Sequence, residues 1–370
     1  MTDRPGRGGR FRETSRSRIR QETRFTLLAK IVISRERLSD IFAPPTMKTM
    51  FEPLYRTGKG VLYVGDAGEM LQTPWFKRLR HRCDLIFTSP PFPLNRRKSY
   101  GNLNGLEYKD WLSGFAPIFR QLLAPKGSLV VELGNAWNAG LPTMSVLSIE
   151  ALLELKKKGG FHLCQEFVWN NITRLPSPAQ WVNVERIRVK DAFTRFWWLS
   201  MTPRPKARNR EVLTEYSKAM KNLLKTRRYN PGRRPSEYKI GRKSFLKDHG
   251  GAIPSNVLSF PNTISFDPYL AYCRRHCIRS HPARMPPDLA KFFIRFLTRE
   301  NDLVVDCFAG SNITGWAAEQ LGRRWRSIER EPTYAIASKS RFPESWFLVS
   351  NPRSIKRRGI NGRGSPIRKR

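Results

Sequence analysis

The chain has 370 residues, enough for one large domain with an insertion or for two domains. It carries 68 Lys and Arg against 30 Asp and Glu, a formal net charge of +38, although 39% of its residues are hydrophobic. Such a charge attracts polyanions, so nucleic acid is the favoured partner and an anionic membrane surface is the rival. The longest apolar stretch near the start, residues 25–33, is short and contains Lys30, so we expect no secretory leader and no membrane span.

The cysteines are few, scattered and odd in number, which predicts a reducing compartment without disulfides: Cys83, Cys164, Cys273, Cys277 and Cys307. Cys273, His276, Cys277 and His281 lie close together in the sequence. They fall in a helical pattern and lack a second cysteine pair, so we expect no metal site there.

Residues 1–45 are rich in Arg, Gly and Ser, and we expect them to be a basic, disordered extension. Residues 46–169 then alternate between strand-like and helix-like patterns of apolar residues. Strands are predicted at 60–64, 85–88, 128–133 and 161–169, and helices from 67, at 108–123 and at 149–157.

Residues 170–263 break this alternation with many Pro, Gly and basic residues, and predict an inserted region. Between 170 and 250 there are 20 basic and 6 acidic residues. The alternation resumes over 264–348, with helices at 288–297 and 314–321 and strands at 303–306 and 325–329. Residues 349–370 form a second basic tail. The whole pattern predicts an α/β fold with a doubly wound, mostly parallel sheet.

The strand ending at Thr88 runs into Ser89-Pro90-Pro91-Phe92. The two prolines keep the backbone extended and remove two amide donors, so the Ser89 hydroxyl and the Pro90 carbonyl can accept hydrogen bonds from an incoming group. Phe92 adds a flat apolar face. These features suit a planar heterocycle with an exocyclic amine, such as cytosine or adenine.

A second motif follows the strand at 303–306, where small residues from Asp306 to Gly315 lead into a helix. Small residues allow close approach of a ligand, and the free amides of a helix start favour an anion. Glu329 ends the next strand, where an acid can accept hydrogen bonds from both ribose hydroxyls. A nucleotide-like ligand is therefore expected.

Together the motifs resemble those of the beta class of DNA methyltransferases that modify exocyclic amines, and Ser-Pro-Pro-Phe is most similar to the cytosine-N4 branch. The family loop Asp-Pro-Phe-x-Gly-Ser-Gly-Thr-Thr is retained at Asp306, Phe308, Gly310, Ser311 and Thr314, with departures at Cys307, Asn312 and Ile313. Asn tolerates positive φ, so the turn can persist at Asn312. The order of the motifs implies a circularly permuted Rossmann-like domain.

The resemblance implies a catalytic half at 46–169, a target-recognition region at 170–263 and an S-adenosylmethionine-binding half at 264–348. It implies catalysis by Ser89, Pro90, Pro91 and Phe92, and cofactor binding by Asp306, Phe308, Gly310, Ser311, Glu329 and Asp66. Asp66 can equally be a helix N-cap. Arg186, Arg188, Lys190 and Arg195 are candidate contacts to duplex DNA, and no metal is implied.

The implied function is methylation of the N4 amine of a flipped cytosine in a restriction-modification system, in the cytoplasm with the nucleoid, with a restriction endonuclease as functional partner. Adenine-N6 methylation remains open, since the same two acceptors suit either amine. An RNA methyltransferase and a noncatalytic nucleic-acid-binding protein also remain alternatives. All of these enzyme interpretations require the two motifs to face one pocket.

Overall fold

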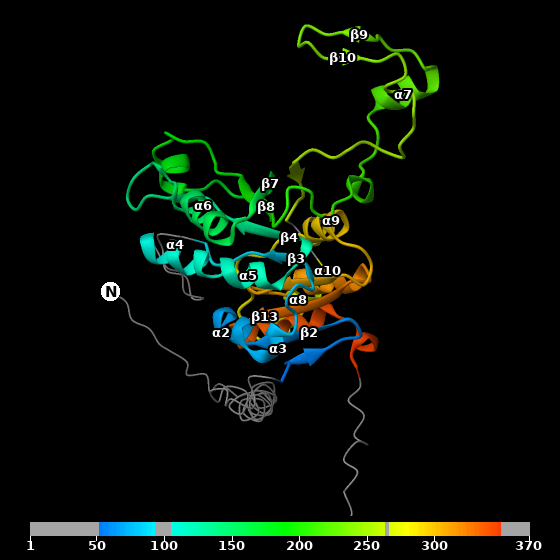
Figure 1. Cartoon of the computed structure of the whole chain (residues 1–370). Coiled ribbons are helices and arrows are strands. Elements are labelled where there is room, and N and C mark those ends of the chain that lie inside the picture. Colours follow the sequence, from blue (N-terminus) through cyan, green and yellow to red (C-terminus); the bar gives the residue numbers. More distant parts are fainter. Residues whose placement is uncertain (1–51, 93–104, 263–265, 349–370) are drawn as a thin grey trace, which may run out of the picture. The chain divides into compact units, whose positions relative to one another are not determined.

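The computed structural model describes residues 52–92, 105–262 and 266–348. A nine-stranded sheet forms its centre, and Figure 1 labels β2, β3, β4, β7, β8 and β13 of it. In spatial order they are β1 (Tyr55–Arg56), β2 (Gly60–Val64), β13 (Arg324–Glu329), β12 (Leu303–Asp306), β3 (Cys83–Thr88), β4 (Leu123–Leu133), β8 (Phe193–Ser200), β7 (His162–Asn170) and β11 (Val257–Ser259). The predictions of disorder for 1–45 and 349–370 lie outside the described residues.

The five strands from β2 to β4 in this order are all parallel, whereas β8 runs antiparallel to both β4 and β7. This confirms the predicted α/β class and the mostly parallel sheet. Strand β12 pairs with β3, with Val304 opposite Leu85 and Val305 opposite Ile86. Segments more than 200 residues apart in the chain therefore lie side by side at the centre of the sheet.

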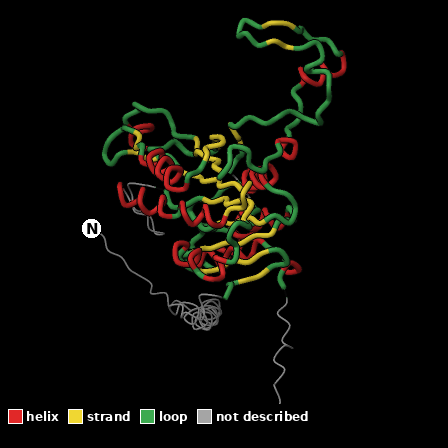
Figure 2. The backbone as a smooth tube through the Cα atoms, in the orientation of Figure 1, coloured by secondary structure: helices red, strands yellow, loops and turns green. Residues whose placement is uncertain are grey.

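Side chains alternate between the two faces of the sheet and build two apolar clusters. Ile86 and Val305 face the first cluster, and Leu85 and Val304 the second. Figure 2 shows the helices on either side of the strands. The first cluster includes residues of α2 (Ala67–Gln72), α3 (Pro74–Lys77), α4 (Gly105–Gly114), α5 (Ala116–Leu122) and α6 (Leu147–Gly159). The second includes residues of α9 (Pro287–Leu297), α10 (Ile313–Gln320) and α11 (Pro332–Ser338), and α8 (Pro268–Arg275) packs in a smaller third cluster.

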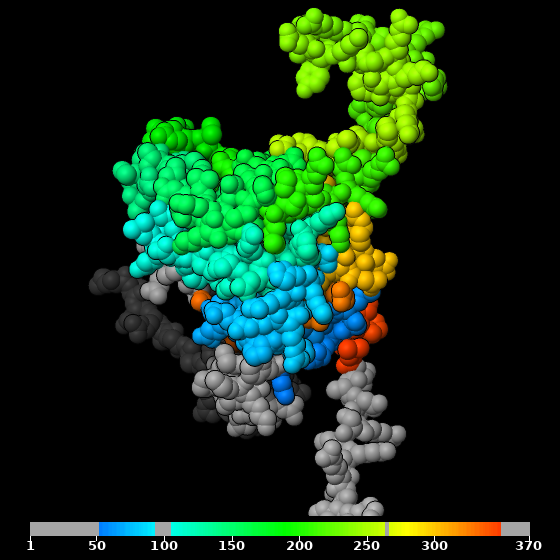
Figure 3. Space-filling model, in the orientation of Figure 1, coloured from blue at the N-terminus to red at the C-terminus, as the bar shows by residue number. Residues whose placement is uncertain are grey.

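The basic block at 170–263, predicted as an inserted region, does not lie wholly outside the sheet. Strands β8 and β11 both fall within it, and both are members of the central sheet. Between them lie α7 (Lys218–Thr226) and the short pair β9 (Gly232–Arg233) and β10 (Lys239–Ile240), drawn in yellow-green in Figure 3. None of residues 213–250 is buried, so this segment has no apolar core of its own.

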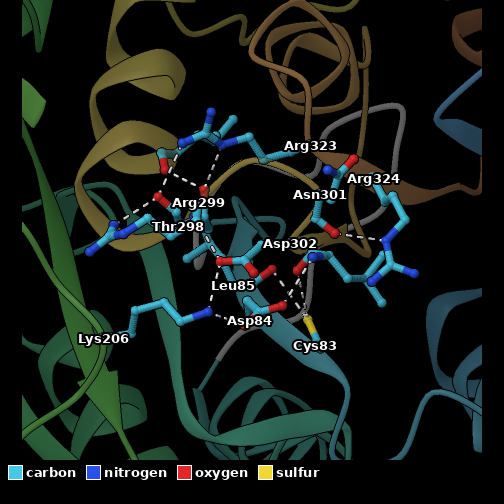
Figure 4. A network of polar contacts seen from close by, with 12 residues as sticks. Cys83, Asp84, Leu85, Lys206, Thr298, Arg299, Asn301, Asp302, Arg323 and Arg324 are labelled. Carbon is cyan, nitrogen blue, oxygen red and sulfur yellow. Dashed lines mark hydrogen bonds and ion pairs between the residues drawn. The ribbon is translucent and has the colours of Figure 1, made fainter.

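An ion-pair cluster fixes the chain after β8 to the amino ends of β3 and β12. Figure 4 shows Lys206 beside Asp84 and Asp302, with Nζ–Oδ distances of 2.7 and 2.8 Å. Asp84 also accepts from the Leu303 amide at 3.1 Å, and Asp302 from the Arg299 amide at 2.7 Å. Burial opposes the charge of Lys206, but its hydrogen bonds to the two carboxylates raise its pKa. One lysine therefore forms ion pairs with two acids that come from distant parts of the chain.

Candidate active site

The two sequence motifs meet at the carboxyl edge of the sheet, because β3 and β12 are neighbours that end there together. Thr88, the last residue of β3, donates from Oγ1 to Oδ1 of Asp306, the last residue of β12, at 2.8 Å. In doubly wound sheets, ligands bind at this edge where the strand order reverses. The predicted proximity of the motifs is therefore present in the structure.

A cavity of about 300 Å³ opens between them. Ser89 and Phe92 line it from the β3 side, and Asp306, Phe308, Gly310 and Ser311 line it from the β12 side. Pro90 is buried and Pro91 half-buried in the turn between them, and neither contributes to the lining. Thus six of the predicted catalytic and cofactor residues surround one pocket.

The loop after β12 has the backbone geometry that its small residues allow. Gly310 has a φ of +52°, and a Cβ there would lie 3.2 Å from the imidazole of His281, so a larger residue would be strained and tightly packed. Asn312 has a φ of 52° and caps α10 by accepting from the Gly315 amide at 3.2 Å. This confirms that the departure at position 312 preserves the turn.

Glu329 and Asp66 occupy different positions relative to this loop. Glu329, at the end of β13, accepts from the Gly310 amide at 2.6 Å and from the Glu331 amide at 2.8 Å, so it holds the loop against the sheet. Asp66 accepts from the Gly68 amide at 2.8 Å as the N-cap of α2, and it does not line the cavity. The structure thus supports its capping role directly.

Phe92 packs closely against the backbone at Gly134, just after β4. A Cβ at Gly134 would come within 2.5 Å of the Phe92 ring, so glycine at 134 is what allows this close packing. Ser89, the first residue of the same motif, is half-buried. The aromatic ring and the hydroxyl are therefore held by β4 as well as by the proline turn.

Glu132, for which no sequence motif predicted a role, lines the cavity from β4 and is only 6% exposed. Burial, and more weakly the charge of Asp306, raises its pKa to about 7, against a hydrogen bond with Ser89 and the charge of Arg174. The available signal was an acid inside the otherwise apolar strand Ser128–Leu133, at the edge where the sites of such sheets lie. A carboxyl group therefore stands directly behind the Ser89 hydroxyl.

Three acids in or beside the pocket have raised pKa values. Burial raises the pKa of Asp306 to about 6, although Thr314, Thr88 and the Phe308 amide hydrogen-bond to it. Burial likewise raises the pKa of Glu329 to about 7. Asp306 and Glu132 line the cavity, and Glu329 lies next to its loop through the Gly310 amide. These carboxyl groups favour a cationic ligand, because their mutual repulsion falls when positive charge enters.

The four candidate DNA contacts separate into two groups. Arg186, Arg188 and Lys190 are exposed after the helical turn at 180–184. Arg195 lies in β8, where Nε pairs with Glu166 at 3.1 Å and Nη1 donates to Asn135 at 2.6 Å. Its guanidinium is already bound within the protein, so the structure does not place Arg195 with the other three.

The described residues contain no group of three or more His, Cys, Asp or Glu side chains arranged to hold a metal ion. Within these same ranges, no helix combines the length and the apolar character needed to cross a bilayer.

Comparison with known proteins agrees with this site. The family described as DNA methylase matches residues 83–340. The chain therefore belongs to the DNA methylase family, which confirms the resemblance carried by the two motifs.

Among individual relatives, the type II methyltransferase M.PvuII of Proteus hauseri is 44% identical over 313 residues, covering 84% of this chain and 92% of the relative. The solved structure of the PvuII DNA methyltransferase (cytosine-N4-specific) superposes with a TM-score of 0.63 at 39% identity, over 79% of this chain and 89% of the other. The type II methyltransferase M2.LlaDCHI of Lactococcus lactis subsp. cremoris is 23% identical over 79% of this chain and 92% of its own.

Proposed function

We propose that this protein transfers the methyl group of S-adenosylmethionine to the N4 amine of a flipped cytosine in duplex DNA, as the methyltransferase of a type II restriction-modification system. The observation that carries this function is the shared cavity between Ser89 and Phe92 on one side and the Asp306 to Ser311 loop on the other. The choice of cytosine N4 rests on the similarity to the cytosine-N4-specific PvuII enzyme.

The residues of the pocket suit S-adenosylmethionine, which supplies an electrophilic methyl group on a sulfonium cation. Asp306 and Glu132 in the lining, and Glu329 bound to the Gly310 amide of the loop, favour that positive charge. Glu329 keeps lone pairs for ribose hydroxyls beyond its two amide contacts. Gly310 leaves room for close approach of the backbone. Asp66, one strand further along the sheet, is assigned a place near the adenine ring by the family resemblance alone.

Methylation of an exocyclic amine requires a localised nitrogen lone pair, and this chain supplies acceptors that localise it. An ionised Glu132 can only accept, so its hydrogen bond with Ser89 is donated by the serine hydroxyl. The Ser89 oxygen is then left with lone pairs for one amine hydrogen. The motif assigns the other amine hydrogen to the Pro90 carbonyl, although Pro90 does not line the cavity. With a pKa near 7, Glu132 can take up the proton released after transfer.

A flipped base must also be held, and Phe92 offers the stacking face. The ring lines the same cavity as Ser89 and is fixed against Gly134. Stacking on such a ring offsets part of the cost of about a few kcal/mol of leaving the helix.

Duplex DNA is the partner that the charge of +38 favours. We assign its recognition to the parts of residues 170–263 that lie outside the sheet, since β8 and β11 are structural. The exposed basic residues Arg186, Arg188 and Lys190 and the exposed segment 213–250 remain for DNA contacts. Most of them bind phosphates, and a few arginines are expected to read guanine edges.

Plasmid DNA from cells that express the protein provides the direct test. Nucleoside analysis combined with modified-base sequencing should detect N4-methylcytosine at one short recurring sequence. A Ser89→Ala variant expressed in parallel is the control for methylation by the host. Detection of N6-methyladenine in place of N4-methylcytosine would assign the enzyme to the other amine, and unmodified DNA at full expression would contradict the proposed activity.

A further inference from the structure

The pocket contains a cation to which neither sequence motif assigns a role. Arg174 follows β7 and lines the cavity together with Ser89 and Glu132. Its Nη1 donates to the Phe193 carbonyl at 3.4 Å. Within the described part of the chain, the other four of its five N–H groups have no hydrogen-bond partner. The guanidinium is therefore available to a ligand.

The backbone that carries Arg174 is fixed by the ends of β7 and β8. The Asn171 amide donates to the Ala192 carbonyl at 2.9 Å, and the Arg174 amide donates to the Asn171 carbonyl at 3.1 Å. Lys190 Nζ donates to the Arg174 carbonyl at 3.4 Å. This tight turn limits where the side chain can reach, which is the requirement for recognising a base rather than a mobile phosphate.

Arg174 lies at the catalytic end of the pocket. Its charge acts on Glu132, which in turn is hydrogen-bonded to Ser89. The second arginine of the lining, Arg284, belongs to the cofactor side, where its Nη1 lies 3.3 Å from Asp267. Of these two cations, Arg174 is thus the one placed toward the target base.

The edge of the target base differs between the two amines that the motif can accept. In cytosine the amine is followed by the N3 acceptor and then by the C2 carbonyl. In adenine it is followed by the N1 acceptor and then by a C–H group. A hydrogen-bond donor opposite the C2 position therefore gains a hydrogen bond only with cytosine, and loss of such a bond is a strong source of discrimination against adenine.

We propose that Arg174 donates a hydrogen bond to the C2 carbonyl of the flipped cytosine and so selects cytosine over adenine. This inference rests on the proposed function, because it names the residue that recognises the base in the same site. Arg174 acts as a specificity-determining residue, separate from the Ser89 and Pro90 acceptors that bind the amine.

A double-mutant cycle tests the contact. One change is Arg174→Met in the full-length protein. The other is a target base analogue that keeps the amine and adjacent ring nitrogen but has C–H in place of the C2 carbonyl. Single-turnover transfer of labelled methyl groups is measured for all four combinations. Arg82→Met, at an exposed arginine outside both the cavity and the candidate DNA contacts, is the matched protein control.

We expect removal of the carbonyl to slow the wild-type enzyme and Arg82→Met about 10- to 100-fold, and to have little effect on Arg174→Met. Equal factors in wild type and Arg174→Met would overturn the proposal, because a purely structural role lowers all rates without coupling to the carbonyl. Arg174→Ala, which also removes the donor, is measured in parallel should the methionine variant not fold. An alanine variant as sensitive to the carbonyl as wild type would also overturn the proposal.

The same experiment separates this inference from the function beneath it. Wild-type methylation of the natural cytosine duplex is measured first, and its absence would remove the proposed function itself. If wild type methylates cytosine and the cycle shows no coupling, only the role of Arg174 is lost.

Discussion

At the scale of single residues, Ser89 is expected to act on the amine rather than on DNA binding. Ser89→Ala removes one of two acceptors, so turnover should fall about 100-fold or more while affinity for duplex DNA changes little. Steady-state methyl transfer and a fluorescence binding assay give the two quantities. Ser145→Ala, a half-buried serine outside the cavity, is the control. Wild-type turnover of Ser89→Ala would remove the residue from the mechanism.

Glu329 should affect the cofactor instead. Glu329→Gln replaces an oxygen acceptor by a donor beside the ribose position, and we expect affinity for S-adenosylmethionine to fall about 10-fold or more. Calorimetric titration measures it, with Glu150→Gln on the surface of α6 as a control for the loss of one charge. An unchanged dissociation constant would show that the carboxylate only holds the Gly310 loop.

The buried carboxyl of Glu132 links stability to pH. Its pKa is about 7 in the folded protein against an ordinary 4.5, so between these values the folded state holds a proton that the unfolded state has released. The stabilisation is fully present below about pH 4.5 and is lost as pH rises through 7. Urea unfolding at about pH 5, 6 and 7, which lie across this window, should give a less negative slope for Glu132→Gln than for wild type. The difference approaches about 1.4 kcal/mol per unit in the middle of the window, and identical slopes would contradict it.

At the scale of elements, Lys206 joins the segment after β8 to the amino ends of β3 and β12 (Figure 4). Lys206→Met leaves Asp84 and Asp302 facing each other without a cation. We expect the free energy of unfolding to fall by about 1–3 kcal/mol, with S-adenosylmethionine affinity retained in the folded fraction. The exposed Lys239→Met is the control, and equal stability of the two variants would show that solvent compensates the acids.

The elements that sequence patterns located well are those covered on both faces. The predicted strands at 60–64 and 303–306 agree with β2 and β12 residue for residue, since continuous apolar runs bounded by Gly and Asp have few alternatives. The predicted helix at 108–123 is two helices, divided where Gly114 precedes Ala116-Pro117. Proline suits the first turn of a new helix, so the apolar spacing continues across a break in the backbone.

Strand β8 was not predicted, because the basic, proline-rich composition of the block around it led to its interpretation as part of an inserted region. Phe193–Ser200 is apolar and aromatic, as a central strand should be, but it lies inside a basic, proline-rich block. For the site, sequence motifs located Ser89, Phe92 and the Asp306 loop. Glu132 had a local signal, an acid inside an apolar strand, but its place at the pocket, like that of Arg174, depends on the tertiary pairing of β4, β7 and β8.

At the scale of the whole molecule, methyl transfer and DNA binding should be separable. Thr214 and Ala252 pair across the base of the exposed segment, so residues 215–249 can be replaced by a short Gly-Ser linker. Because none of these residues is buried, we expect unchanged S-adenosylmethionine affinity and thermal stability. DNA affinity should fall about 10-fold or more, with a shallower dependence on salt. DNA affinity and salt slope equal to wild type would assign recognition to another part of the surface.

The bond between Thr88 and Asp306 also has a consequence for biosynthesis. During synthesis the segment that contains Ser89 leaves the ribosome early, but its neighbour β12 emerges more than 200 residues later. Until then β3 lacks one of its two neighbours, and the donor of the methyl group has no loop to hold it. A truncated or stalled nascent chain is therefore inert toward the genome, and modification begins only when synthesis is almost complete.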